Sequence, residues 1–318
     1  MRSITARNLK GVFASCVIPF DSKGALNLNQ LKKLQRFITT RSSSPTRVCF
    51  ANPAITELHA LSDKERKDLF AIMLEEANGA IIGAQGAIDP TVDGQIRLGK
   101  EAGSMGVHLL KFVPPVQTRP ANGREAVAAV SLILEGVDIP CLFYNTTAFG
   151  GTKLTADDVV HLHDSFPNLI AFETGELPDL AYVKNETRSQ ISCAAISEAS
   201  GLMSMSLGSD GYFSGNPVIL EASLRMHADC ARGEFLRARN YYLRNRDFFS
   251  LGNFPYPPTE PQPVTAKYCL SLLGISVGRT RPPLKYPPTS EHRQIYSRVL
   301  DQHKKDVRGL VSFFDSKD

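Results

Sequence analysis

Two short apolar runs joined by one helical pattern decide the fold of this chain. The first run is Ile139-Pro-Cys-Leu-Phe-Tyr144, and the second is Leu169-Ile-Ala-Phe-Glu173. Between them, Thr155-Ala-Asp-Asp158 has the sequence of a helix start, because a hydroxyl and a carboxylate three residues apart can cap the free amides of a first turn. Continuous apolar runs are typical of parallel strands that are covered on both faces. The segment therefore predicts a strand–helix–strand unit of a parallel sheet.

The same alternation fills the first two thirds of the chain. Amphipathic patterns separate further apolar runs, and one of them begins with a second capping sequence, Ser62-Asp-Lys-Glu65. Eight strand–helix units in about 220 residues favour a TIM (β/α)8 barrel over a doubly wound sheet, which usually has fewer strands. The remaining predicted strands cover residues 12–18, 47–51, 80–84, 107–113, 191–196 and 211–214.

The pattern changes after Pro217. Long helical patterns follow over residues 218–232, 234–250, 264–273 and 290–313, interrupted by a proline-rich stretch at 253–263. We therefore predict a barrel over residues 1–222 that carries the active-site pocket, and a C-terminal helical domain over residues 223–318.

Composition excludes several classes of function. The net charge of +4 in 318 residues is spread rather than blocked, which argues against a nucleic-acid interface. No apolar run approaches the about 20 residues needed to cross a membrane, and the N-terminus lacks the apolar stretch of a signal peptide. The six cysteines form no C-x-x-C pair and fit small buried apolar residues better than disulfides or zinc ligands. We expect a cytoplasmic protein with no metal and no cofactor.

Seven sequence elements in a fixed order carry a family resemblance. Leu61-Ser-Asp-Lys-Glu-Arg66 matches the family motif L-S-x-x-E-R, with Glu57 as the glutamate that precedes it. The other elements are Gly11-Val-Phe-Ala-Ser-Cys-Val-Ile-Pro-Phe20, Phe143-Tyr-Asn145, Phe166-Pro-Asn168, Gly208-Ser-Asp-Gly211, Ala266-Lys267 and Arg281-Pro-Pro-Leu284. The chain thus resembles the dihydrodipicolinate synthase / N-acetylneuraminate lyase family over nearly its whole length. The resemblance implies a TIM barrel with a C-terminal helical domain, a lyase activity on a small molecule, and assembly into a homotetramer or homodimer.

The chain departs from the family pattern at Glu173. The family writes this strand as N-[IL]-V-G-[IV]-K-[ED], and its lysine forms a Schiff base with a keto acid. A carboxylate cannot form an imine, so the resemblance implies a scaffold without its usual nucleophile. Only Tyr144 is kept from the family's chemical residues.

Other departures remove groups that hold anionic substrates. Ala54 and Ile55 fall within the family's G-T-T-G, Val116 stands where a tyrosine is common, and Phe149 takes the place of an arginine. A site with these residues offers few charge-assisted hydrogen bonds to carboxylates and favours a larger, less charged ligand that is bound by burial. The predicted substrate-binding residues are Ala54, Ile55, Val116, Phe149, Ile196, Glu198 and Asn216.

Tyr144 and Glu173 are the predicted catalytic pair. Burial of Glu173 in an apolar strand raises its pKa toward neutrality, which suits a general acid or base. The alternative for Glu173 is a structural ion pair, and the alternative for Tyr144 is a packed aromatic ring. Lys111 is an unusual charge in an apolar strand. It is either a relocated nucleophile, a lysine that reaches outward to solvent, or the ion-pair partner of Glu173.

Three hypotheses of function follow. The first is a lyase that works without a Schiff base and uses acid–base chemistry to cleave, dehydrate or cyclise a relatively apolar substrate. The second is a catalytically inactive family member that acts as a ligand sensor or oligomer partner. The third is a class I aldolase whose lysine has moved to Lys111. An open cavity beside Tyr144 and Glu173 is expected for the first.

Overall fold

A computed structural model describes residues 4–15, 17–41, 48–50, 57–86, 89–115, 123–252, 261–284 and 286–316 of the chain. Within these residues, eight strands form a closed barrel in sequence order, with parallel neighbours from the second strand to the eighth. The predicted TIM barrel is therefore confirmed. The strands are β1 (Gly11–Ser15), β2 (Val48–Phe50), β3 (Ile81–Gln85), β4 (Leu109–Phe112), β5 (Cys141–Tyr144), β6 (Leu169–Thr174), β7 (Ser192–Ala195) and β8 (Gly211–Ser214).

Two compact units, each made of separate stretches of sequence, can be described one at a time. Unit 1 consists of Met1–Phe13, Ser44–Phe50 and Ala80–Phe213, and unit 2 of Ala14–Ser43, Ala51–Gly79 and Ser214–Asp318. Unit 1 holds β2 to β7 and most of β1 and β8. The predicted domain boundary at residue 222 remains a prediction.

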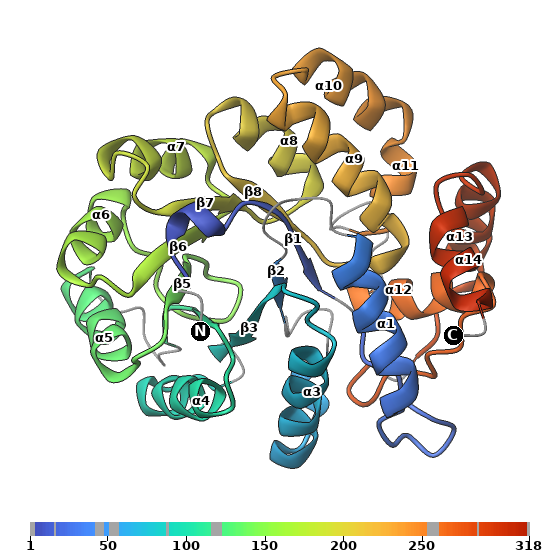
Figure 1. Ribbon diagram of the computed structural model, residues 1–318, viewed down its shortest axis with the longest axis horizontal. Helices are drawn as coiled ribbons and strands as arrows, with labels where there is room; N and C mark the ends of the chain where they lie inside the picture. The colour runs from blue at the N-terminus through green and yellow to red at the C-terminus, as the bar shows by residue number, and fades with distance from the viewer. Residues whose placement is uncertain are drawn as a thin grey trace. The chain divides into compact units, whose positions relative to one another are not determined.

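In unit 1, the helices that follow the strands lie on the outer side of the sheet (Figure 1). The strands are buried along almost their entire length, which explains why they read as continuous apolar runs. As predicted, α6 begins with a capping box between Thr155 and Asp158. The helices are α4 (Val92–Ser104), α5 (Gly123–Gly136), α6 (Ala156–Ser165), α7 (Leu177–Glu186) and α8 (Glu198–Ser206).

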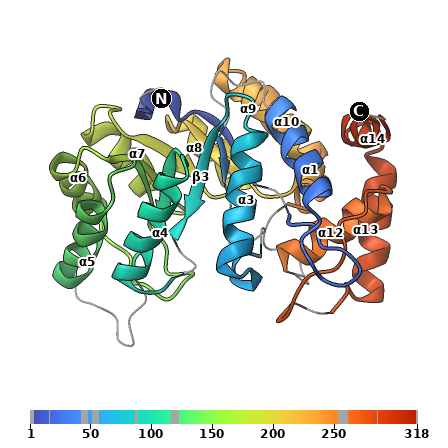
Figure 2. The ribbon, with the colours of Figure 1, turned by 60° about the horizontal axis from the view of Figure 1, so that its bottom comes forward.

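Helices make up most of the described residues of unit 2, and α1 packs beside α3 (Figure 2). The capping box of Ser62 and Glu65 opens α3, as predicted. The helices are α1 (Leu28–Arg41), α3 (Asp63–Glu75), α9 (Leu220–Ala231), α10 (Phe235–Arg244), α11 (Arg246–Phe249), α12 (Gln262–Leu272), α13 (Ser290–Gln302) and α14 (Arg308–Asp315).

Two of the predicted C-terminal helices are longer than the helices in the structure. The pattern over 234–250 is broken at Asn245, whose side-chain amide donates to the Tyr241 carbonyl at 2.7 Å and ends α10. The pattern over 290–313 is interrupted by turns after α13, where His303 Nδ1 lies 3.0 Å from Asp306 Oδ2. Asn and Asp favour such breaks because their side chains compete with the helical backbone for hydrogen bonds.

The strand ends agree with the expected positions to within a residue or two, except at β1. That strand ends at Ser15, although the apolar run suggested residue 18. The five described cysteines are free and buried, as expected of small apolar residues: Cys49, Cys141, Cys193, Cys230 and Cys269. In the part of the chain that the structure describes, no helix is long and apolar enough to span a bilayer.

Candidate active site

An apolar cluster fills the barrel interior of unit 1 and forms the floor of the candidate site. Side chains alternate between the two faces of a strand. Residues two positions after a cluster member therefore point into the barrel near the carboxyl end of their strand, where TIM-barrel chemistry takes place. The cluster consists of Leu9, Phe13, Val48, Phe50, Ile81, Leu109, Leu142, Ala171, Ala194 and Phe213.

This alternation places three of the predicted residues above the floor. Lys111 follows Leu109 on β4, Tyr144 follows Leu142 on β5, and Glu173 follows Ala171 on β6. Tyr144 and Glu173 are also direct partners in the register of β5 and β6.

Lys111 and Glu173 form a buried ion pair. Lys111 Nζ lies 2.5 Å from Glu173 Oε2, and the two side chains are 1% and 3% exposed. Lys111 therefore does not reach outward to solvent, and its side chain is paired with Glu173, which was one of the three alternatives. A buried ion pair is expensive in desolvation and gives little net stability.

The ammonium of Lys111 lies close to the barrel axis. It is 3.6 Å from the ring centroid of Phe213 on β8, 4.5 Å from that of Tyr144 on β5 and 5.9 Å from that of Phe50 on β2. These rings and the carboxylate of Glu173 come from four different strands. Each aromatic face attracts the cation, so the position of the charge is fixed from several sides.

Burial controls the protonation of this cluster. It raises the pKa of Glu173 to about 7, although the charge of Lys111 acts in the opposite direction. Burial also lowers the pKa of Lys111, and here Glu173 opposes the shift. A carboxyl group with a pKa near 7 is able both to accept and to give a proton at neutral pH.

Tyr144 remains a proton donor at neutral pH. Its pKa is raised to about 12, first by burial and second by the charge of Glu173. The ring packs edge-on against Phe149, with 6.2 Å between centroids. Phe149 belongs to the loop after β5, and Asn145 closes that loop with two hydrogen bonds to the backbone of Leu154, of 2.8 and 2.9 Å.

Sequence reasoning missed Gln85, the last residue of β3. It is 1% exposed, and neither its Oε1 nor its Nε2 has a hydrogen-bond partner. It is the register partner of Lys111. The signal in the sequence was a single amide inside the apolar run that ends in Gly83-Ala-Gln-Gly86.

Of the remaining predicted site residues, three lie in the described part of the chain. Ile196 follows β7, is 39% exposed, and adjoins Gly175 after β6. Glu198 is buried at the start of α8. In unit 2, Asn216 caps the turn at Pro217–Ile219 and donates to the Leu251 carbonyl at 2.8 Å, so its side chain is engaged in local structure. Ala54, Ile55 and Val116 lie outside the described residues.

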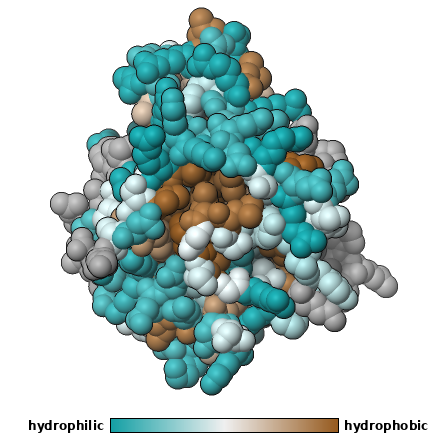
Figure 3. Space-filling view, turned by 90° about the vertical axis from the view of Figure 1, so that its right-hand side faces the viewer, coloured by the Kyte–Doolittle hydropathy of each residue, from teal (hydrophilic) through white to brown (hydrophobic). Residues whose placement is uncertain are grey.

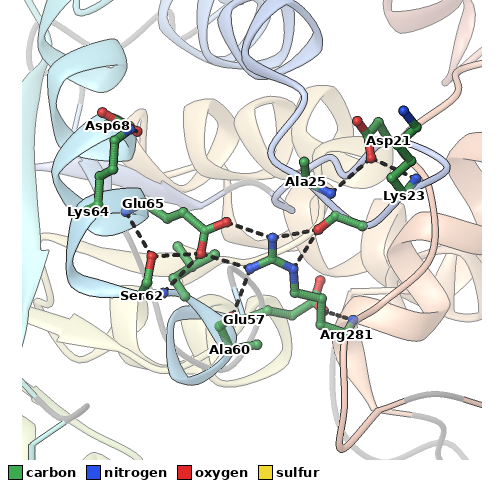
Figure 4. A network of polar contacts seen from close by, with 12 residues as sticks. Asp21, Lys23, Ala25, Glu57, Ala60, Ser62, Lys64, Glu65, Asp68 and Arg281 are labelled. Atoms are coloured by element: carbon green, nitrogen blue, oxygen red, sulfur yellow. Dashed lines mark hydrogen bonds and ion pairs between the residues drawn. The ribbon is translucent and has the colours of Figure 1, made fainter.

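A second polar network lies in unit 2 and explains several of the sequence motifs (Figure 4). Arg281 forms two hydrogen bonds with the Glu65 carboxylate, of 2.6 and 2.9 Å, and also donates to the carbonyls of Gly24 and Ala60. Glu57 accepts from the Arg281 backbone amide at 2.9 Å and pairs with Lys267 at 2.6 Å. Three matched sequence elements thus meet in one structural network, and Glu57 has a structural role there.

In the described part of the chain, no group of three or more His, Cys, Asp or Glu residues is arranged to hold a metal ion. Proton transfer is the chemistry that the cluster of unit 1 offers directly.

Comparison with known proteins identifies the family. The 4-hydroxy-tetrahydrodipicolinate synthase of Pelodictyon phaeoclathratiforme is 25% identical over 301 residues, which cover 94% of this chain and 98% of that protein. The 4-hydroxy-tetrahydrodipicolinate synthase 2 of Halalkalibacterium halodurans is 26% identical over 298 residues, covering 92% and 98%.

Solved structures share the fold at lower identity. The chloride-inhibited dihydrodipicolinate synthase from Acinetobacter baumannii, solved with pyruvate, superposes with a TM-score of 0.82 at 20% identity over 94% of this chain and 99% of that one. A dihydrodipicolinate synthase variant described as monomeric gives 0.84 at 18% identity over 94% and 98%. The sequence profile of the Dihydrodipicolinate synthetase family matches residues 8–303. The chain therefore belongs to the Dihydrodipicolinate synthetase family.

Proposed function

We propose that this protein is a lyase that works by proton transfer through Glu173 and Tyr144, without a Schiff base on β6. The observation that carries the proposal is the buried carboxyl group of Glu173, whose pKa of about 7 suits a general base at neutral pH. It lies beside the Lys111 ammonium and next to Tyr144 in strand register.

The three side chains have complementary roles in this proposal. The Glu173 carboxylate takes a proton from a carbon next to a carbonyl, and the C–H electron pair moves to the carbonyl oxygen to form an enolate. With a β-hydroxy carbonyl compound it takes the hydroxyl proton instead, the hydroxyl carbon becomes a new carbonyl as the Cα–Cβ bond breaks, and the pair released from that bond moves to the carbonyl oxygen. The Tyr144 hydroxyl donates to that oxygen, and the Lys111 ammonium stabilises the negative charge that develops there. Charge stabilisation of this kind is effective in a buried site, where water does not screen it.

Burial argues against an inactive descendant of the family. An isolated ion pair in an apolar barrel, with a fully buried and unpartnered Gln85 beside it, is costly to keep. Apolar side chains in these positions would give a more stable protein. Retention of the polar groups fits a site that binds a ligand.

A second candidate function is imine chemistry at Lys111. The position of Nζ near the barrel axis supports it, since a carbonyl bound above the floor would meet the amine there. Burial lowers the pKa of Lys111 and so favours the neutral amine that attacks a carbonyl. Glu173 would then carry protons during formation of the imine.

The substrate class follows from the relatives and from the departures of this chain. The relatives are named as 4-hydroxy-tetrahydrodipicolinate synthases, and one solved structure contains pyruvate. We propose that this protein acts on a less charged carbonyl compound, because Phe149 packs on Tyr144 in the loop where the family has an arginine.

Exchange of hydrogen for deuterium next to the carbonyl of simple ketones tests the proposal without knowledge of the substrate. We would follow 2-butanone and pyruvate by NMR in heavy water with the wild type, Glu173→Gln, Tyr144→Phe and Lys111→Met. The wild type should catalyse exchange, and Glu173→Gln should lose it at a temperature where circular dichroism shows that the variant is still folded.

Borohydride trapping with the same compounds separates the two candidates. The proton-transfer proposal predicts no covalent adduct, whereas an adduct located on Lys111 by mass spectrometry would replace it with imine chemistry. Neither exchange nor adduct with the wild type would favour the inactive member that senses a ligand or partners an active homologue.

The cytoplasmic location and assembly into a homotetramer or homodimer also remain proposals. Unit 2 leaves large apolar side chains exposed, among them Leu236 and Leu243 of α10, at 62% and 59%. Figure 3 shows an apolar area framed by hydrophilic residues on the side where Figure 1 draws α13 and α14. Apolar areas of this kind commonly mark association surfaces, and sedimentation velocity would give the oligomeric state.

A further inference from the structure

The side chain of Gln85 points into the barrel. Gly83, two residues earlier, faces the interior, because a Cβ added there would lie 2.2 Å from the Phe50 ring of the apolar floor. Gly86 faces the opposite side, where an added Cβ would lie 3.1 Å from Gln95 of α4. The alternation of the strand then places Gln85 above Phe50, on the same side as Lys111.

The amide of Gln85 is buried without hydrogen bonds. Both of its polar atoms lack a partner, although the residue is only 1% exposed. Buried polar groups are nearly always paired, and an unpaired one keeps the full penalty of desolvation. A donor and an acceptor held in this way, next to each other in one plane, are available to a ligand.

Gln95 is the matched case of a structural glutamine. It is fully buried, and its amide exchanges two hydrogen bonds of 3.3 Å with the backbone of Val113. The two side chains have the same chemistry and the same burial. Only Gln85 leaves its hydrogen-bonding groups open.

The neighbours of Gln85 define the charge of the group that it would bind. Lys111 and Glu173 carry compensating charges at 2.5 Å, so together they offer no net charge to a ligand. Phe50 provides an apolar surface below. A carboxylate would find no unpaired cation among these residues.

We propose that Gln85 recognises an uncharged group with an adjacent donor and acceptor, namely a hydroxy-ketone or carboxamide, bound over the Lys111–Glu173 pair. The amide nitrogen donates to the ligand carbonyl, and the amide oxygen accepts from its hydroxyl or amide N–H. The inference rests on the proposed function in placing the reacting carbonyl at this pair, and it adds the substrate class and a specificity-determining residue.

Stability measurements test whether the side-chain amide of Gln85 lacks hydrogen-bond partners. Gln85→Leu should raise the midpoint of thermal unfolding, because it removes two unsatisfied polar atoms from the barrel. Gln95→Leu should lower it, because it leaves the Val113 backbone unpaired. A fall in both variants would show that Gln85 already has a structural partner and would overturn the inference.

Binding measurements test the recognition itself. Hydroxyacetone offers a carbonyl and a hydroxyl, acetone offers the carbonyl alone, and pyruvate carries a negative charge. In titrations followed by the ¹⁵N side-chain amide signals, hydroxyacetone should bind the wild type most tightly and shift the signal of Gln85. Its affinity should fall about tenfold in Gln85→Leu, with a smaller loss for acetone.

Equal affinity of the wild type and Gln85→Leu for hydroxyacetone, or tighter binding of pyruvate, would overturn the inference. These readouts need no turnover. If hydroxyacetone binds at Gln85 but the wild type catalyses no proton exchange, only the proposed function is refuted. If the wild type catalyses exchange, and Gln85→Leu changes neither the exchange rate nor the affinity for hydroxyacetone, only this inference is refuted.

Discussion

Lys111 and Glu173 stabilise each other's charged forms. Among the described residues, neither side chain forms an ion pair with any other group. Removal of one partner leaves the other charge buried and uncompensated, which is far worse than removal of both. The pair therefore behaves as one unit in stability, whatever its part in chemistry.

Substitution of Lys111 by Met should make stability depend strongly on pH. Without the ammonium, the pKa of Glu173 rises further above its unfolded value of about 4.5. The folded state then holds a proton that the unfolded state releases, so stability is present below about pH 4.5 and is lost as pH rises. At pH 8 the variant should be about 3–5 kcal/mol less stable than the wild type, as measured by urea unfolding.

The control for that prediction is the double variant Lys111→Met with Glu173→Gln. It contains no buried charge, so its stability should recover most of the loss at pH 8 and depend little on pH in this range. A single variant as stable as the wild type at pH 8 would mean that the carboxylate is solvated or has another partner.

The rate of proton exchange should follow the ionisation of Glu173. As the base, its carboxylate form is required, so the rate should rise with pH through about 7 and then level off. Tyr144, with a pKa of about 12, should cause no fall below pH 10. A rate profile measured by NMR from pH 5 to 10 checks this, and Glu173→Gln should lack the rise.

At the scale of elements, β3 depends on glycine for the packing of the barrel floor. The Phe50 ring occupies the space where a side chain at Gly83 would lie, at 2.2 Å from an added Cβ. Gly83→Ala should therefore destabilise the protein by about 1–3 kcal/mol through overpacking. Gly123→Ala is the control, because nothing lies within 4 Å of its added Cβ. Equal unfolding midpoints for the two variants would contradict this account.

Local signals in the sequence were sufficient for most elements. Continuous apolar runs gave the strands of the barrel, and the capping boxes of Ser62 and Thr155 gave the starts of α3 and α6. The helix breaks near Asn245 and His303 were missed, because each depends on one side chain that competes with a backbone carbonyl or stabilises a turn.

The candidate site was only partly predictable. Tyr144 and Glu173 could be placed together from the strands that carry them. The pairing of Lys111 with Glu173 remained one alternative among three, because it depends on β4 and β6 facing one axis across an intervening strand. Gln85 was missed because a lone amide in a strand is uninformative until its burial and its missing partners are known.

At the scale of the whole molecule, the motifs that identify the family serve the architecture of unit 2 more than chemistry. Arg281 joins Gly24, Ala60 and Glu65, although up to 257 residues separate them in sequence. A planar guanidinium satisfies all of these acceptors at once, and an ammonium does not. Such contacts keep segments that are distant in sequence together within unit 2.

Arg281→Lys should loosen unit 2 at sites far from the substitution in sequence. Hydrogen exchange should accelerate in residues 17–31 and 57–66, with a loss of about 1–3 kcal/mol in stability. Arg239→Lys is the control, because within the described residues the hydrogen bond of that exposed side chain runs only to its neighbour Asn240, at 3.5 Å. Changes confined to residues near 281 would show that the network does not hold these segments.

The ion pair between Arg281 and Glu65 should make the stability of unit 2 fall at acid pH. Hydrogen bonds from Arg281 lower the pKa of Glu65 to about 2. Because the folded value is below the unfolded one, this stabilisation is present above about pH 4.5 and is lost as pH falls toward 2. The difference in stability between the wild type and Arg281→Lys should therefore narrow over that interval.

The interleaving of the two units along the chain has a consequence for biosynthesis. Residues 14–43 and 51–79 leave the ribosome early, but the partners that complete their unit lie in residues 214–318. Domains that are continuous in sequence fold as they emerge, whereas unit 2 cannot close until residues 214–318 have been synthesised. Its early helices, α1 and α3, must wait with apolar faces uncovered, and this interval is when a chaperone would be needed most.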